Sequence, residues 1–171
     1  PDEELLVGLI ERYPDVKFIV APHEIDPARI EKFCERISRP ALRYTQLTPQ
    51  SDLAAAGVLF VDTIGILSSV YRYGRWGYIG GGFGAGIHNT LEAATFGLPL
   101  AFGPRYGKFR EARDLVTLRG AASIASAEEL ERWFAGLHDD PDATGRSGTI
   151  CKEYVLQHKG ATARIMDEIC R

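Results

Sequence analysis

Short apolar runs alternate with amphipathic segments along most of the chain, and this alternation predicts its secondary structure. Runs of β-branched and aromatic residues are typical of strands, and apolar residues three or four positions apart are typical of helices. We predict strands at residues 17–21, 41–44, 58–61, 76–79, 98–102 and 121–124. We predict helices at residues 2–13, 145–156 and 161–169, and further helices that begin near residues 27, 66, 90 and 127.

Residues at the predicted helix ends support these boundaries. Asp26-Pro27 is an N-cap followed by proline at the first helical position, and Ser126 is a second N-cap. Gly97 suits a left-handed residue at a helix end, and Pro99 cannot continue the helix. In the helix that begins near residue 66, three residues are expected to face the core: Leu67, Val70 and Tyr71.

Short strands that alternate with helices predict an α/β fold. We expect a Rossmann-like, doubly wound parallel sheet with helices on both faces, formed by one domain that spans residues 1–171. Ligands of such sheets bind at the carboxyl ends of the strands. We therefore expect one cleft, lined by the loops that follow residues 21, 61, 79 and 102.

The most unusual stretch of the chain is residues 78–99, in which five glycines fall between Gly80 and Gly86. Glycines let the backbone approach a ligand closely, and the first turn of a following helix presents unpaired N–H groups. The stretch therefore predicts an anion site, and an anion beside hydroxyl groups indicates a nucleotide. The spacing is not a dinucleotide fingerprint, because Ala85 follows Gly80-x-Gly82 and no acidic residue ends an obvious next strand about twenty residues on. It is not a P-loop either, because no Gly-Lys-Ser/Thr follows.

Polar side chains near these glycines have more than one interpretation. Asn89 is a helix cap or a ligand contact, and Glu92 either completes a capping box or binds a ribose hydroxyl. His88 is interpreted as a structural donor rather than a base. Arg105 and Lys108 are candidates for added positive charge, with a solvated surface role as the alternative for Arg105.

Composition narrows the choice of partners. The formal net charge of −3 and the lack of a Lys/Arg cluster argue against a nucleic acid partner. Cys34, Cys151 and Cys170 are widely spaced and form neither a CxxC pair nor a disulfide framework, which indicates a reducing compartment. The sequence has no apolar run of about 18 residues, so we expect a soluble domain.

Several short motifs follow one another along residues 17–109. They are Ala21-Pro22-His23, Asp62-Thr63-Ile64-Gly65-Ile66-Leu67, Gly80-Gly81-Gly82-Phe83, Gly86-Ile87-His88-Asn89-Thr90-Leu91-Glu92-Ala93, Gly97-Leu98-Pro99, Gly103-Pro104 and Lys108-Phe109. In this order they resemble the carboxyl-terminal half of the 3-deoxy-D-manno-octulosonic acid (Kdo) transferases, which are GT-B glycosyltransferases of lipopolysaccharide synthesis. Three places depart from the family pattern: Pro22-His23-Glu24 stands for Pro-Arg-His, Ile64-Gly65-Ile66-Leu67 for Met-Gly-Glu-Leu, and Lys108-Phe109 for Asn-Phe.

The resemblance implies a donor-binding domain for CMP-Kdo that uses no metal and no other cofactor. Cytidine contacts would fall near Pro22-His23 and Ile64-Gly65, phosphate contacts on the glycine loop through Asn89, and a ribose contact on Glu92. A plain loop histidine is the alternative for His23. The donor-binding residues implied are Pro22, His23, Ile64, Gly65, Gly81, Gly82, Gly86, His88, Asn89 and Glu92.

The resemblance also implies that the catalytic base, the acceptor groove and the membrane anchor belong to an amino-terminal half outside residues 1–171. We therefore expect no catalytic residue in this chain and no transfer by this chain alone. The whole protein would transfer Kdo to a lipid A precursor at the cytoplasmic face of the bacterial inner membrane, with membrane association through the other half.

Two alternatives remain open at this point. One is an enzyme of similar architecture, either a GT-B glycosyltransferase with a UDP donor or half of a nucleotide-sugar epimerase; nucleotide preference separates this alternative from CMP-Kdo binding. The other is a non-catalytic α/β interaction domain whose glycines only form turns, which no nucleotide would stabilise against heat.

Overall fold

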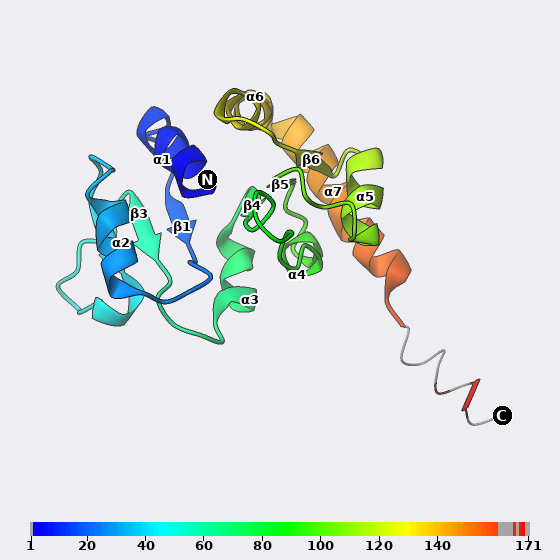
Figure 1. The fold of residues 1–171 in the computed structure, drawn as a ribbon, viewed down its shortest axis with the longest axis horizontal. Helices are drawn as coiled ribbons and strands as arrows, with labels where there is room; N and C mark the ends of the chain where they lie inside the picture. The colour runs from blue at the N-terminus through cyan, green and yellow to red at the C-terminus, as the bar shows by residue number, and fades with distance from the viewer. Residues whose placement is uncertain (1, 161–165, 167, 170–171) are drawn as a thin grey trace. The chain divides into compact units, whose positions relative to one another are not determined.

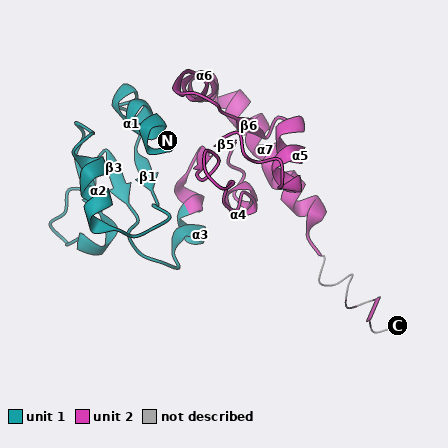
Figure 2. Ribbon diagram, viewed as in Figure 1, with its two compact units in different colours: residues 1–70 teal, residues 71–171 magenta. Residues whose placement is uncertain are grey.

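The computed structural model describes residues 2–160 together with Met166, Glu168 and Ile169 (Figure 1). The predicted helix at 161–169 lies largely outside the described residues. The chain divides into two compact units, residues 1–70 (unit 1) and 71–171 (unit 2), which Figure 2 colours separately. Within the described residues there are two parallel three-stranded sheets, one in each unit. The predicted α/β fold with parallel strands is confirmed.

Unit 1 alternates helices and strands. Its elements are α1 (Asp2–Arg12), β1 (Phe18–Val20), α2 (Pro27–Cys34), β2 (Ala41–Arg43), the 3-10 turn η1 (Tyr44–Gln46), β3 (Val58–Phe60) and α3 (Leu67–Val70). The strand order is β1-β3-β2, so the last strand in sequence lies in the centre. The core of unit 1 includes Phe33 and Phe60, whose rings meet edge to face with centroids 5.3 Å apart. Asp26 caps α2 as predicted, because its Oδ1 accepts the amide of Ala28 at 2.9 Å.

The short helix α3 differs from the prediction for its region. It ends after Val70 and continues as the 3-10 turn η2 (Tyr71–Tyr73), where unit 2 begins. Leu67 is 36% exposed rather than core-facing, because it starts the helix directly after an exposed loop. Val70 and Tyr71 are half-buried, and Tyr71 packs against the core of unit 2.

Unit 2 carries the glycine-rich stretch. After η2 its elements are β4 (Gly77–Ile79), α4 (Leu91–Thr95), β5 (Leu100–Phe102), α5 (Arg110–Thr117), β6 (Ala121–Ser123), α6 (Ala127–His138) and α7 (Pro141–His158). The parallel strands follow one another in the order β4-β5-β6. The core fills the space between this sheet, α4, α5 and α7, and its largest fully buried side chains include Leu100, Phe102 and Leu115.

The helix α7 begins at Pro141, four positions before the predicted start at 145. Asp140 caps it by accepting the amide of Ala143 at 2.9 Å, and Pro141 fits the first turn because its missing N–H would have had no partner there. This is the same Asp-Pro signal as in α2, and it was missed at this position. The predicted cap at Ser126 is confirmed, because Ser126 Oγ accepts the amide of Glu129 at 3.3 Å.

The helices α4 and α7 approach each other closely at two glycines. Gly97 has a φ of +73°, which confirms the predicted left-handed helix end. A Cβ built on Gly148 of α7 would lie 2.2 Å from the carbonyl oxygen of Gly97. One turn further, Cys151 is fully buried, and its thiol donates to the carbonyl oxygen of Gly120 at 3.0 Å. The helix that follows the glycine loop is therefore held by contact between backbones.

Candidate functional site

The glycine loop joins β4 to α4 and folds back on itself. The amides of Gly84 and Gly86 both donate to the carbonyl oxygen of Gly81, at 2.9 and 3.3 Å. Gly81 and Gly86 have φ angles of +89° and +145°, which side chains other than glycine rarely adopt. A Cβ on Gly81 would also lie 2.4 Å from the carbonyl oxygen of Gly86. Both predicted site glycines are therefore required by the shape of the loop.

The glycine loop is also joined to the loop that follows β5. The two strands are parallel neighbours, with Ile79 in register with Phe102, so the two loops begin at the same edge of the sheet. A Cβ on Gly82 would lie 2.6 Å from the Cα of Gly103. The amide of Arg105 donates to the carbonyl oxygen of Gly82 at 2.9 Å. Gly82 therefore permits a backbone contact between the loops, as a tight ligand loop requires.

Asn89 and Glu92 form the entrance to α4. Asn89 Oδ1 accepts the amide of Leu91 at 2.9 Å, and Asn89 Nδ2 donates to Glu92 Oε1 at 2.9 Å. Asn89 thus binds an amide of the first turn of α4 from the position before the N-cap, which is Thr90. Both side chains are exposed. Burial raises the pKa of Tyr71, and the nearby negative charge of Glu92 raises it further. The ribose contact of Glu92 stays a prediction.

His88 lies between the glycines and Asn89. Its amide donates to the carbonyl oxygen of Gly80 at 3.1 Å, which closes the base of the loop. The imidazole is exposed, and its Nε2 lies 3.2 Å from the position of a Cβ on Gly81. The ring therefore covers one side of the glycine loop, in agreement with a structural role.

The predicted site residues of unit 1 follow two neighbouring strands. Pro22 and His23 come after β1, and Ile64 and Gly65 come after β3; the two strands are parallel and adjacent. Both pairs therefore begin at the same edge of the sheet of unit 1. The side chain of Ile64 is 88% exposed, and Gly65 has a φ of +91°. Ile64 is therefore an exposed apolar side chain next to a glycine in the left-handed region.

Asp62 lies two residues before Ile64, and no separate role was predicted for it from the sequence. It is 5% exposed and accepts hydrogen bonds from Arg43 Nε at 2.9 Å, Thr45 N at 2.9 Å and Thr45 Oγ1 at 2.6 Å. Burial alone would raise the pKa of Asp62, but the bonds from Thr45 and Arg43 outweigh it and lower the pKa. Asp62 therefore anchors the end of β2 to the start of the Ile64 loop.

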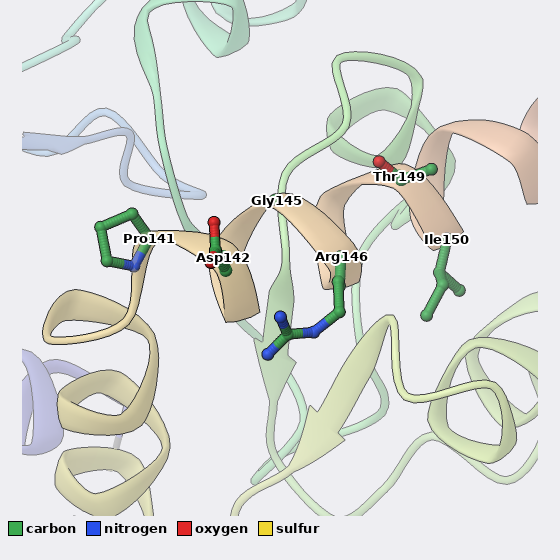
Figure 3. A pocket seen from close by; sticks show the side chains of 6 residues that line it. All are labelled: Pro141, Asp142, Gly145, Arg146, Thr149 and Ile150. Carbon is green, nitrogen blue, oxygen red and sulfur yellow. The ribbon is translucent and has the colours of Figure 1, made fainter.

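Two hollows lie on the surface of unit 2. One, of about 360 Å³, is lined by Gly84, Ala85, Arg105, Gly107 and Lys108, and lies beside the glycine loop. The other, of about 630 Å³, follows one helix, and Figure 3 shows its lining residues along α7: Pro141, Asp142, Gly145, Arg146, Thr149 and Ile150. This second hollow contains none of the predicted site residues. The first brings the two candidates for positive charge, Arg105 and Lys108, together.

Within the part of the chain that the structure describes, no group of three His, Cys, Asp or Glu side chains is arranged to hold a metal ion. The prediction that no metal is bound stays a prediction. No helix among the described residues combines the length and the apolar character that a bilayer span requires.

Comparison with known proteins identifies relatives. No model of a known protein family matches the sequence. The curated 3-deoxy-D-manno-octulosonic acid transferase of Rickettsia bellii is 30% identical over 174 residues, which is 98% of this chain and 40% of the relative. The transferase of the same name from Aquifex aeolicus is 29% identical over 110 residues, which is 64% of this chain and 30% of the relative. The chain therefore spans less than half the length of these curated relatives.

A solved structure shares the fold. It is the crystal structure of the C-terminal CMP-Kdo binding domain of WaaA from Acinetobacter baumannii, with a TM-score of 0.78 and 23% identity over 92% of this chain and 84% of that chain. At this identity the likeness establishes the fold, while the sequence matches establish the relationship. Together they confirm the predicted resemblance: this chain is related to the carboxyl-terminal domain of the 3-deoxy-D-manno-octulosonic acid transferases.

Proposed function

We propose that this chain is the donor-binding domain of a Kdo transferase and that it binds CMP-Kdo. The observation that carries the proposal is the contact between the loops after β4 and β5 at the carboxyl edge of a parallel sheet. There Gly81 and Gly86 hold positive φ angles, and Gly82 packs directly on Gly103. The names of the sequence relatives and of the fold relative support the choice of ligand.

The chemistry of sugar transfer suits such a loop. When the sugar leaves CMP-Kdo, negative charge develops on the departing phosphate. Backbone N–H groups that are already fixed in place stabilise this charge without a metal ion. In our proposal, the loop from Gly80 to Asn89 binds the phosphate and Glu92 accepts a hydrogen bond from a ribose hydroxyl through Oε2, while Oε1 stays with Asn89.

The cytidine is assigned to the loops of unit 1. Ile64 offers an exposed apolar side chain against which a base stacks, and Gly65 leaves space beside it. Pro22 and His23 begin at the same sheet edge as Ile64 and Gly65. In the sequence pattern, His23 stands where the family has an arginine. Its imidazole donates one N–H where a guanidinium donates several.

The remaining parts of the reaction are assigned to the rest of the protein. We propose that the whole protein transfers Kdo to a lipid A precursor at the cytoplasmic face of the inner membrane, and that the catalytic base lies outside residues 1–171. This chain alone would then bind the donor and transfer nothing. Detectable Kdo transfer by this chain alone would contradict that assignment.

Calorimetric titration tests the proposal. We expect CMP to bind this chain more tightly than UMP or AMP. We expect Asn89→Ala and Glu92→Ala to weaken CMP binding, whereas Glu153→Ala, an exposed carboxylate on α7, should leave it unchanged.

The other outcomes identify the alternatives. A preference for UMP would point to a UDP-sugar enzyme. Equal or undetectable binding of all three nucleotides, without thermal stabilisation by any of them, would favour an interaction domain and contradict the proposal.

A further inference from the structure

The hollow beside the glycine loop is lined by three small residues and two cationic side chains. Gly84 and Ala85 come from the loop after β4, and Arg105, Gly107 and Lys108 come from the loop after β5. Gly84, Ala85 and Gly107 are exposed, and none has a side chain larger than a methyl group. The hollow therefore presents two cationic side chains around exposed main chain, within unit 2 alone.

Arg105 is held in place at two points. Its amide donates to the carbonyl oxygen of Gly82 at 2.9 Å, and its Nη1 donates to the carbonyl oxygen of Gly84 at 2.6 Å. The Nε and Nη2 groups, which form the opposite edge of the guanidinium, donate to no described atom. This edge carries two parallel N–H bonds, the arrangement that matches the two oxygens of a carboxylate. Arg105 is thus oriented by the glycine loop, and its bidentate edge is unused.

The two cations of the hollow, Arg105 and Lys108, have no carboxylate partner among the residues that the structure describes, although several other arginines of the chain are paired. The amides of Ala85 and Gly107 also make no hydrogen bond within the described chain. Two unpaired cations and unpaired amides around one hollow favour an anionic ligand.

We propose that Arg105 and Lys108 bind the carboxylate of the sugar acid in the donor, and that they make the domain select nucleotide-linked sugar acids over nucleotide-linked neutral sugars. The inference rests on the proposed function. A CMP-linked sugar acid carries two separate anionic groups, a phosphodiester and a carboxylate. The chain offers two separate sets of donors, the glycine loop and this hollow, and the flat carboxylate matches the free edge of Arg105.

The test compares cytidine, CMP and freshly prepared CMP-Kdo by calorimetry. We expect the wild-type chain to bind CMP-Kdo about tenfold more tightly than CMP, as a charge-assisted hydrogen-bonded pair allows. We expect Arg105→Ala to remove this gain while the affinity for CMP changes less than about twofold. Arg105→Lys keeps the charge without the fork and should retain part of the gain. We expect Lys108→Asn to reduce it.

The test includes a matched control variant and two measurements on each variant, calorimetric binding and thermal unfolding. Arg113→Ala removes an exposed arginine of α5 that does not line the hollow, and should change nothing. Thermal unfolding confirms that each variant is folded. If Arg105→Ala weakens CMP and CMP-Kdo by the same factor, the hollow binds the phosphate and the inference is wrong. Unchanged CMP-Kdo binding in both Arg105→Ala and Lys108→Asn would also overturn it.

Failure of the proposed function gives a different pattern. In that case the wild-type chain binds neither CMP nor CMP-Kdo. Free Kdo then tests the hollow by itself: binding of Kdo that Arg105→Ala abolishes supports the inference, and absence of Kdo binding overturns it.

Discussion

Gly81 and Gly84 lie three positions apart in one loop, yet a side chain meets different surroundings at each. At Gly81 a Cβ would lie 2.4 Å from a carbonyl oxygen in a backbone with φ of +89°, whereas at Gly84 the nearest atom is 3.5 Å away. We expect Gly81→Ala to deform the loop, lower the free energy of unfolding by about 2 kcal/mol and abolish CMP binding in a titration. Gly84→Ala is the matched control, and an equal loss in both would contradict the loop assignment.

Asp62 gives unit 1 a specific pH dependence. Its pKa is lowered in the folded chain, so its contribution to stability is present above the unfolded pKa of about 3.9 and is lost as the pH falls through the folded pKa. We expect Asp62→Asn to lower the free energy of unfolding by about 2 kcal/mol at neutral pH. The gap to the wild type should narrow between about pH 5 and about pH 2, as measured by urea unfolding.

Asp52→Asn is the control for this pH dependence. Asp52 is exposed and accepts one hydrogen bond, from the amide of Ala55 at 2.9 Å, so its loss should be small. A gap between Asp62→Asn and the wild type that stayed constant with pH would show that the carboxylate charge of Asp62 does not stabilise unit 1.

Hydrogen bonds between residues close in sequence could be predicted, whereas hydrogen bonds between residues far apart in sequence could not. The side chain of Asn89 reaches an amide only two positions away, so the sequence pattern contains both partners. Asp62 meets partners 19 and 17 positions earlier, which strand pairing alone brings near it. The signal available in the sequence was the position of Asp62, an acidic residue directly after the apolar run at residues 58–61.

Two glycines of α7 make opposite predictions about its packing. A Cβ on Gly148 would lie 2.2 Å from the carbonyl oxygen of Gly97, whereas a Cβ on Gly145 would meet no described atom within 4 Å. We expect Gly148→Ala to separate α4 from α7 and lower the melting temperature, and Gly145→Ala to raise it, since alanine favours a helix by about 1 kcal/mol over glycine. Thermal unfolding followed by circular dichroism measures both variants. A Gly148→Ala variant as stable as the wild type, or more stable, would contradict the close approach.

The predicted elements were correct where one face of the segment is apolar throughout. All the strands predicted from residues 17–124 are present. Phe18–Val20 and Val58–Phe60 are β-branched and aromatic runs, whereas Ala121–Ser123 has no such residue and is placed by its pairing with β5. The start of α7 was misplaced because Thr144, Gly145 and Ser147 interrupt its apolar pattern, although Asp140-Pro141 marks it. In α3 the core-facing prediction was wrong for Leu67 alone, which starts the helix after an exposed loop, and the helix gives way to a 3-10 turn after Val70.

Each unit has its own hydrophobic core, and both tryptophans, Trp76 and Trp133, lie in unit 2. We therefore expect tryptophan fluorescence to follow the unfolding of unit 2, and far-UV circular dichroism to follow both units. Asp62→Asn should shift the midpoint seen by circular dichroism more than the midpoint seen by fluorescence. Identical shifts in both would show that the chain unfolds as one cooperative unit.

At the scale of the molecule, alternation of strands and helices was enough to predict parallel strands and the loops of the site. It did not predict that β3 lies between β1 and β2, nor the two separate sheets. Strand order depends on pairing between segments far apart in the chain, which periodicity does not encode. The contact of Gly82 with Gly103 was unpredictable for the same reason.

The buried thiol of Cys151 allows the opening of unit 2 to be measured by chemical modification. Burial raises the pKa of Cys151 to about 12, so almost none of it is thiolate at neutral pH while unit 2 stays closed. Cys34 lies half-buried in unit 1, where burial also raises its pKa. Alkylating reagents attack the thiolate, so each thiol reacts faster when its unit opens. The rate of modification of Cys34 and of Cys151, followed by peptide mass spectrometry, therefore reports the opening of each unit separately without an added label.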